Sequence, residues 1–485
     1  MAGKSETKNG ALTGRIRING SDCEASLSPG GVLTWQGEGE RSLAMEQEAL
    51  GFGIEEGRRI RVRGFSGDRK RRRKDFVLEM ESDEMVGLWS ERLKDCFDSF
   101  GRPKRLFVVL NPFGGKKNAR EIFQNEIKPL LTAADIIYTL QETRYQLHAQ
   151  EIAYKLDILK YDGIVCVSGD GVLVEVVNGL LQREDWDSAI KVPLGIIPAG
   201  TGNGMAKSLL DAAGEAYSIS NAVFSVLRGH KRALDVSTVM QGVTKFFSVL
   251  MLTWGFVADV DIGSEKYRWM GSTARFQFYA LLRIMNLRRY HGCVQFVPAP
   301  GYEEFGEPLQ RNFDSKAFTS VQEQGQGNGV LIHHGGYQGP SVCFDSREWR
   351  SLDGPFISVW LNNVPWSDKG TMPAPQAKFS DGYLDMVITR DCPKSALLAL
   401  MLQLADGSHL KSPYVIYLKV KAFQLEPGQR VGNASKGGIV DSDGEVLARG
   451  DGTYECHKRY GDLMMYGSPI EMFVDQGLAT IFSPR

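Results

Sequence analysis

Between residues 106 and 210, short apolar runs alternate with segments whose apolar residues recur at helical spacing. Short apolar runs are typical of buried strands, and helical spacing indicates helices that bury one face. The pattern predicts strands at 106–110, 135–140, 163–167 and 192–197, and helices at 118–131, 148–159, 172–181 and 205–210. Such alternation favours an open, Rossmann-like α/β sheet, whose ligand crevice lies beyond the carboxyl ends of the strands.

The pattern changes after residue 235, where β-rich segments replace the alternation. These segments lie at 246–252, 292–296, 356–361, 383–388 and 415–423. We expect an α/β domain over 101–235, followed by a second, mostly β sandwich domain over 236–485. The polar segment 306–336 is rich in Gln, Gly and Asn, and we expect it to form a mobile insertion.

Residues 1–100 contain short candidate strands at 14–18, 59–63 and 75–79, followed by a helical segment at 83–97. Several strands closed by one Trp-bearing helix resemble a pleckstrin-homology-type module, so we expect a small β or membrane-targeting module here.

A basic stretch within this module, residues 58–74, carries ten Arg or Lys residues against the single acidic Asp68. Three interpretations stay open: a solvated loop between two strands, attraction to an anionic membrane leaflet, or nuclear import.

Composition narrows the class of protein. With 485 residues, 42% of them hydrophobic and 24% charged, the chain can bury large cores and should form two or three domains. The formal net charge of −1 gives no reason to expect a nucleic-acid partner. Seven cysteines without a Cys-x-x-Cys pair favour a reducing compartment over a disulfide framework or a zinc site.

The chain starts without the apolar segment of a secretory signal peptide. Its longest apolar stretch, 246–258, is too short for a transmembrane span and is interrupted by polar residues. We therefore expect a cytoplasmic protein without a transmembrane span. The oligomeric state does not follow from these residues.

Three glycine-rich turns follow predicted strands. They read Asn-Pro-Phe-Gly-Gly-Lys at 111–116, Ser-Gly-Asp-Gly at 168–171 and Pro-Ala-Gly-Thr-Gly-Asn at 198–203. Helix N-termini flanked by glycines favour phosphate binding, because free N–H groups point at the anion and the backbone approaches it closely. A phosphate would repel Asp170, unless a divalent cation lies between them or Asp170 takes a proton from an attacking hydroxyl. Both interpretations indicate phosphoryl transfer, whereas the alternative is an Asp that only braces its own turn.

These three motifs resemble those of the diacylglycerol-kinase-like lipid kinases. Within that superfamily, the sequence is most similar to the sphingosine (long-chain base) kinases of the plant type. The narrower resemblance depends on Ser168, on the segments 254–261 and 264–268, and on Asp-Gly-Glu at 443–445. It covers roughly residues 104–450 and leaves residues 1–100 outside.

The resemblance implies that Asp170 is the general base for a primary hydroxyl that attacks the γ-phosphate of ATP, with Ser168, Gly169 and Gly171 around that hydroxyl. It also implies a set of ATP-binding residues: Asn111, Pro112, Phe113, Thr143, Arg144, Tyr145, Gln146, Leu147, Glu175, Gly200, Thr201, Gly202, Arg268, Arg275, Asp443 and Gly444. For several of them a structural role is the alternative, such as a helix cap for Thr143, an exposed helix position for Glu175 and a plain β-turn for Asp443.

Asp259 and Asp261 end an apolar, aromatic segment and are expected to share one face of a strand. A carboxylate in an apolar pocket is a suitable counter-charge for a cationic amine, and the resemblance selects Asp261 for that role. The alternative for Asp261 is a cap of the following helix. By the same resemblance His409 lies near the lipid, and its alternative is a buried core histidine.

The sequence thus predicts an ATP- and Mg²⁺-dependent kinase of long-chain sphingoid bases that works at the cytosolic face of a membrane. Mg²⁺ should arrive with ATP, held largely by phosphates and water, because no cluster of His, Cys and carboxylates suggests a dedicated metal site. A diacylglycerol or ceramide kinase of the same fold is one alternative. An NAD(P)-dependent oxidoreductase, suggested by the glycines at 200–204, and a non-catalytic lipid-binding scaffold are the others.

Overall fold

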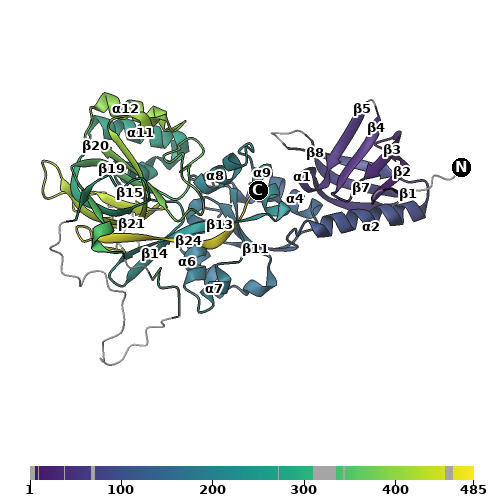
Figure 1. Cartoon of the computed structure of the whole chain (residues 1–485), viewed down its shortest axis with the longest axis horizontal. Helices are drawn as coiled ribbons and strands as arrows, with labels where there is room; N and C mark the ends of the chain where they lie inside the picture. Colours follow the sequence, from purple (N-terminus) through teal and green to yellow (C-terminus); the bar gives the residue numbers. More distant parts are fainter. Residues whose placement is uncertain are drawn as a thin grey trace.

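The computed structural model of the chain describes residues 6–8, 10–37, 39–66, 71–270, 272–309, 335–341, 344–453 and 463–484. An N-terminal β module, a central α/β part and a β-rich part follow one another along the long axis of the molecule (Figure 1). Most of the segment 306–336, for which a mobile insertion is predicted, lies outside the described residues.

The N-terminal module is an antiparallel sheet with one long helix packed on it. Its described strands run in the order β5-β4-β3-β2-β8-β7-β6, with β1 beside β2. They are β1 (Glu6–Lys8), β2 (Ala11–Ile18), β3 (Ser21–Leu27), β4 (Val32–Gly37), β5 (Gly39–Ala44), β6 (Ala49–Glu55), β7 (Arg59–Ser66) and β8 (Arg72–Glu79), with the short helix α1 (Met45–Glu48) before β6. Helix α2 (Asp83–Ser99) buries Trp89 and Leu93 against the sheet, so this module has a core of its own.

The basic stretch 58–74 spans β7 and β8, and the tip between them lies outside the described residues. Arg63 pairs with Asp135 at 2.7 Å, and Arg71 pairs with Glu215 at 3.2 Å. Both acidic partners belong to the α/β part. Part of the positive charge therefore holds the module against its neighbour.

The α/β part contains parallel strands in the order β10-β9-β11-β12, which confirms the prediction of an open α/β sheet. Its strands are β9 (Arg105–Leu110), β10 (Ile137–Glu142), β11 (Gly163–Ser168) and β12 (Leu194–Pro198). Its helices are α3 (Ala119–Ile122), a π-helical turn (Phe123–Ile127), α4 (Lys128–Ala133), α5 (His148–Lys155), α6 (Asp170–Leu181), α7 (Trp186–Ala189), α8 (Gly204–Ala212) and α9 (Ile219–Arg228).

The β-rich part continues the same sheet through its last strand. Strand β24 (Ile470–Phe482) runs parallel to β12 and antiparallel to both β13 and β21. The remaining strands are β13 (Lys231–Gln241), β14 (Thr244–Ser248), β15 (Met251–Gly255), β16 (Tyr290–Pro298), β17 (Glu307–Pro308), β18 (Arg350–Asp353), β19 (Phe356–Asn362), β20 (Leu384–Arg390), β21 (Val415–Arg430), β22 (Ile439–Ser442) and β23 (Glu445–Arg449). Helices α10 (Phe256–Ser264), α11 (Ser272–Met285) and α12 (Lys394–Gln403) accompany this sheet.

The expectation that Asp259 and Asp261 share one face of a strand is wrong. Strand β15 ends at Gly255, and both aspartates lie in helix α10, which begins at the next residue. Gly255 adopts a φ of +86°, and a Cβ there would lie 2.5 Å from the carbonyl oxygen of Ile357. Glycine therefore permits a sharp turn from strand into helix that the apolar pattern does not reveal.

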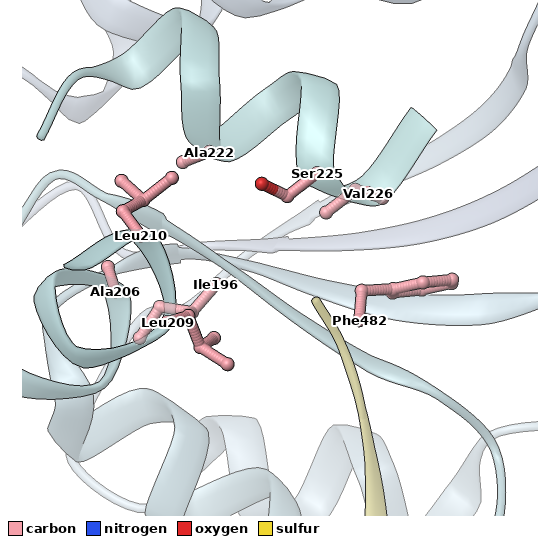
Figure 2. A pocket seen from close by; sticks show the side chains of 8 residues that line it. All are labelled: Ile196, Ala206, Leu209, Leu210, Ala222, Ser225, Val226 and Phe482. Atoms are coloured by element: carbon pink, nitrogen blue, oxygen red, sulfur yellow. The ribbon is translucent and has the colours of Figure 1, made fainter. Parts of the chain in front are cut away.

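A small apolar cavity of about 10 Å³ lies between β12, α8, α9 and the end of β24 (Figure 2). The hydroxyl of Ser225 at its wall already donates a hydrogen bond to the carbonyl of Asn221 at 2.8 Å. The cavity is thus a packing gap with room for about one water molecule. Within the described residues, no helix combines the length and apolar character that a membrane crossing requires.

Candidate active site

Three loops meet at the carboxyl edge of the parallel sheet, directly after Leu110, Ser168 and Pro198. They pack so closely that only glycine fits at the crossings. A Cβ on Gly200 would lie 2.2 Å from the Cα of Gly169, and a Cβ on Gly115 would lie 2.9 Å from the carbonyl carbon of Gly200. The structure therefore brings the three predicted glycine-rich turns together at one point.

Asp170 is the first residue of α6, and its side chain connects two of these loops. Its carboxylate accepts the N–H of Gly204 at 2.6 Å and the N–H of Met205 at 3.2 Å, both from the first turn of α8. Its own N–H donates to the carbonyl of Gly202 at 3.1 Å. Asp170 thus braces the neighbouring loop and helix, beyond the turn in which it lies.

Burial raises the pKa of Asp170 to about 7. The two N–H donors of α8 lower that pKa, while the negative charges of Asp443 and Asp368 raise it further. A carboxyl group that titrates near neutrality can take a proton from a substrate and release it again. Asp368, in the loop after β19, was not predicted, because no motif marks it in the sequence.

Open space adjoins this aspartate. A Cβ built on Gly171 would meet no heavy atom within 4 Å, and one built on Gly202 would meet only the carboxylate of Asp170, at 3.7 Å. These glycines are therefore not required by the packing around them. They border the N-terminus of α6, where an anion is stabilised.

The loop 143–147 lies beside this region and is fixed from two sides. The N–H of Thr143 donates to the carbonyl of Leu110 at 2.8 Å. A carboxylate oxygen of Glu175 accepts the N–H of Ala149 at 3.0 Å, within the first turn of α5. The alternative interpretation of Glu175 as a merely exposed helix residue is wrong, because this half-buried side chain of α6 caps the preceding helix, α5.

The turn 443–444 between β22 and β23 approaches the same loop, because Gln146 donates to the carboxylate of Glu445 at 2.9 Å. The carboxylate of Asp443 accepts hydrogen bonds from the backbone N–H groups of Val249, Leu250 and Met251, at 2.9, 3.1 and 2.7 Å. Asp443 therefore fixes the turn between β14 and β15.

Asp259 and Asp261 leave α10 in different directions. Asp259 is buried and accepts hydrogen bonds from Tyr290 at 2.8 Å and from Arg283 at 3.2 Å, so its charge is neutralised inside the fold. Asp261 is half-buried, and its negative charge acts on Asp441 of β22. The helix thereby separates a structural aspartate from one that faces the other acidic groups.

The remaining predicted residues are more scattered. Arg268 lies in the 3-10 helix Glu265–Met270, and its side chain falls outside the described part of the chain. Arg275 is buried in α11, with its guanidinium 4.5 Å from the ring of Phe276. His409 is also buried, with Nε2 3.0 Å from the carbonyl oxygen of Pro373, as in the alternative of a core histidine.

Two regions of the chain match known domain families. Residues 105–239 match the diacylglycerol kinase catalytic domain. Residues 342–460 match the YegS C-terminal NAD kinase beta sandwich-like domain. The first match contains the three glycine-rich loops, and the second contains the turn 443–444.

The chain is 52% identical to sphingosine kinase 2 of Arabidopsis thaliana, over 98% of this chain and 97% of that protein. It is also 52% identical to sphingosine kinase 1 of the same plant, over 98% and 96%. The chain belongs to the sphingosine kinase family. Human sphingosine kinase 1 is 32% identical over 74% of this kinase and 90% of its own length.

These comparisons correct one expectation. The resemblance was expected to leave residues 1–100 outside, yet the alignment with the Arabidopsis kinases covers 98% of the chain. The N-terminal module therefore belongs to the region shared with them.

Proposed function

We propose that the kinase transfers the γ-phosphoryl group of ATP to the primary hydroxyl of sphingosine-like long-chain bases, giving long-chain base 1-phosphates. The observation that carries this proposal is Asp170, a carboxylate with a pKa near neutrality at the junction of the glycine loops. The identity to two sphingosine kinases supports the substrate class.

In this proposal Asp170 takes the proton from the attacking hydroxyl. The N–H groups of Gly204 and Met205 hold its carboxylate in one orientation, so that the remaining lone pairs can accept that proton. The open space at Gly202, where a Cβ would lie 3.7 Å from the carboxylate of Asp170, gives the hydroxyl a place next to that group. Positioning and charge stabilisation supply most of the catalysis in phosphoryl transfer, because the protein has little covalent chemistry to perform.

ATP supplies the phosphoryl group, and the loops after β9, β11 and β12 with the loop 143–147 are its proposed binding site. Asp170 and its acidic neighbours would repel the phosphates, so the site fits a nucleotide that arrives with Mg²⁺. The described residues contain no group of three or more His, Cys, Asp or Glu able to hold a metal alone. We therefore expect phosphates and water to supply most of its ligands.

Asp261 is the proposed partner of the amino group of the long-chain base. Diacylglycerol and ceramide lack a cationic amine, so this carboxylate should favour the base over both of them. Transfer from labelled ATP to a panel of sphingoid bases, ceramide and diacylglycerol tests the proposal. We expect labelled product from the sphingoid bases alone, and strongly reduced transfer to those bases by the Asp261→Asn variant. Full activity of that variant toward sphingosine would show that the substrate class is wrong.

We also propose peripheral contact with a membrane, because an apolar face of the β-rich part is exposed. Helices α11 and α12 pack together through a shared core, yet they leave Leu282, Met285, Leu398 and Leu402 exposed to 39%, 74%, 40% and 74%. Apolar patches of this kind mark contact surfaces, and a lipid substrate must be extracted from a bilayer. Sedimentation with vesicles should show binding that Met285→Glu and Leu402→Glu abolish.

A further inference from the structure

Asp441 is a carboxylate that the packing of the protein does not explain. It lies in the middle of β22 with 0% of its surface exposed. Neither of its carboxylate oxygens has a hydrogen-bond partner in the part of the chain that the structure describes. Burying an unpaired carboxylate costs several kcal/mol, so such a group calls for a functional explanation.

A second buried polar group without a hydrogen-bond partner among the described residues lies beside Asp441. Thr253 of β15 is the antiparallel partner of Asp441, so the two side chains emerge on the same face of the sheet. Its hydroxyl is also fully buried, and it too has no hydrogen-bond partner among the described residues. The adjacent pair, Trp254 and Val440, belongs to the main core on the opposite face.

Helix α10 covers the face on which Asp441 lies. Ala258 and Ile262 of this helix pack against Ile439, which precedes Asp441 by two residues on the strand. Asp261 follows Ala258 by three residues and so lies on the same face of α10. Glu265 follows Ile262 at the same spacing and is the first residue of the 3-10 helix after α10. The geometry therefore directs these two carboxylates toward Asp441.

The surroundings of Asp441 favour its neutral, protonated form when no cation is nearby. Burial raises its pKa well above the usual value for an aspartate, and the negative charges of Asp261, Asp443, Glu445 and Glu265 raise it further, in that order. These charges come from α10, from the 3-10 helix after it and from the β22–β23 turn. A positive charge brought to this face would oppose their effect and lower the pKa of Asp441.

The described carboxylates include no group of three that could hold a metal ion, which favours an organic cation at this face. We propose that Asp441, with Thr253 beside it, is a positioning residue for the ammonium group of the substrate, and lies behind Asp261 as a second carboxylate. This inference rests on the proposed function, because a long-chain base supplies the cation. When the ammonium reaches Asp261, Asp441 gives its proton to solvent, and the new negative charge holds the amine in place.

Two consequences distinguish this role from a structural one. Binding of the base should release a proton from the enzyme, because the ammonium lowers the pKa of Asp441. Affinity for the base should therefore rise with pH through the range in which Asp441 titrates. Binding of a neutral lipid such as ceramide should release no proton, and its affinity should not rise with pH through this range.

The test compares Asp441→Asn with the wild-type kinase, because asparagine keeps the shape and stays neutral. We expect KM for sphingosine to rise about ten-fold and kcat to change less than about two-fold, since one nearby charge in a partly buried site is worth roughly that factor. Calorimetric titration with sphingosine in two buffers of different ionisation enthalpy should show that proton release is lost. Asp451→Asn, an exposed aspartate after β23, is the matched control and should match the wild type.

Several results would overturn the proposal. An Asp441→Asn kinase with wild-type KM and proton release would do so, as would a rise in KM for Mg²⁺-ATP in place of sphingosine. Wild-type enzyme that transfers nothing to sphingosine would instead refute the proposed function itself. If Asp441→Asn does not fold, Thr253→Val carries the test, and an unchanged KM for sphingosine in that variant also refutes the proposal.

Discussion

Opposing influences act on the carboxylate of Asp170. Burial and neighbouring acids favour its protonated form, whereas two N–H groups of α8 favour its ionised form. The resulting pKa of about 7 keeps a useful fraction of the group ionised at neutral pH. The same two donors fix its orientation, so a single side chain sets both the geometry and the proton affinity of the proposed base.

Replacement of Asp170 by Asn removes that base while keeping one acceptor for α8. We expect kcat to fall by about 10²- to 10⁴-fold, the usual contribution of a general base. In the wild type, kcat/KM should decrease as the pH falls below about 7, because a protonated Asp170 cannot accept the hydroxyl proton. A pH–rate profile measured for both proteins checks this, and a flat wild-type profile would contradict it.

The glycines of the loops allow a matched pair of substitutions. Gly171→Ala places its methyl group in open space, so the melting temperature should be unchanged while turnover drops about ten-fold or more because the substrate is displaced. Gly200→Ala places its methyl group 2.2 Å from Gly169 and should destabilise the fold itself. Thermal unfolding and kinase assays on both variants separate the two effects. Full activity of Gly171→Ala would mean that no substrate occupies that space.

The N-terminus of helix α5 is capped by a residue of another helix. Leu147, directly before α5, has a φ of +66° and provides no side-chain cap, so the carboxylate of Glu175 in α6 takes over that role. The position of the loop 143–147 therefore depends on the packing of α5 against α6. That loop carries five of the predicted ATP-binding residues.

Glu175→Ala should weaken this arrangement. Loss of the cap should cost about 1 kcal/mol of unfolding free energy, and KM for ATP should rise because the loop is less well fixed. Glu175→Gln retains an oxygen acceptor and serves as the control, with a smaller change in both quantities. Chemical denaturation and ATP-dependence measurements give the two values. Equal KM values for all three proteins would mean that the loop does not contact the nucleotide.

The local pattern predicted the central elements well, because strands β9, β11 and β12 are buried apolar runs followed by glycine turns. It failed where the structure depends on distant partners. Strand β24 was not predicted, since Asp475, Gln476 and Gly477 interrupt its apolar residues and its place in the sheet comes from pairing with β13 and β21. Asp441 carries no motif, so only the fold reveals its burial next to Asp261.

Specific polar contacts join the N-terminal module to the α/β part. Arg102, which follows α2, donates hydrogen bonds to the carbonyls of Met45, Glu46, Ala49 and Leu50 around α1. From the α/β part, the guanidinium of Arg228 reaches the carbonyl of Gln47 in the same helix.

Arg102→Ala should loosen the N-terminal module. Four carbonyl groups lose a charged donor, which should cost about 3 kcal/mol of unfolding free energy and increase protease cleavage between α2 and β9. Arg92→Ala is the control, because among the described residues the side chain of Arg92 donates a hydrogen bond only to the carbonyl of Gly10, within the module. Limited proteolysis and thermal unfolding measure both effects. Equal cleavage of the two variants would show that the module is held by other contacts.

Strand β24 has a consequence for biosynthesis. It lies between β12 and β21, where the α/β and β-rich parts share one sheet. In the sequence, however, it comes after all the other described strands of that sheet. Until β24 has been synthesised, it cannot link the strands β12 and β21 on either side of it. We therefore expect a chain truncated before β24 to lack kinase activity.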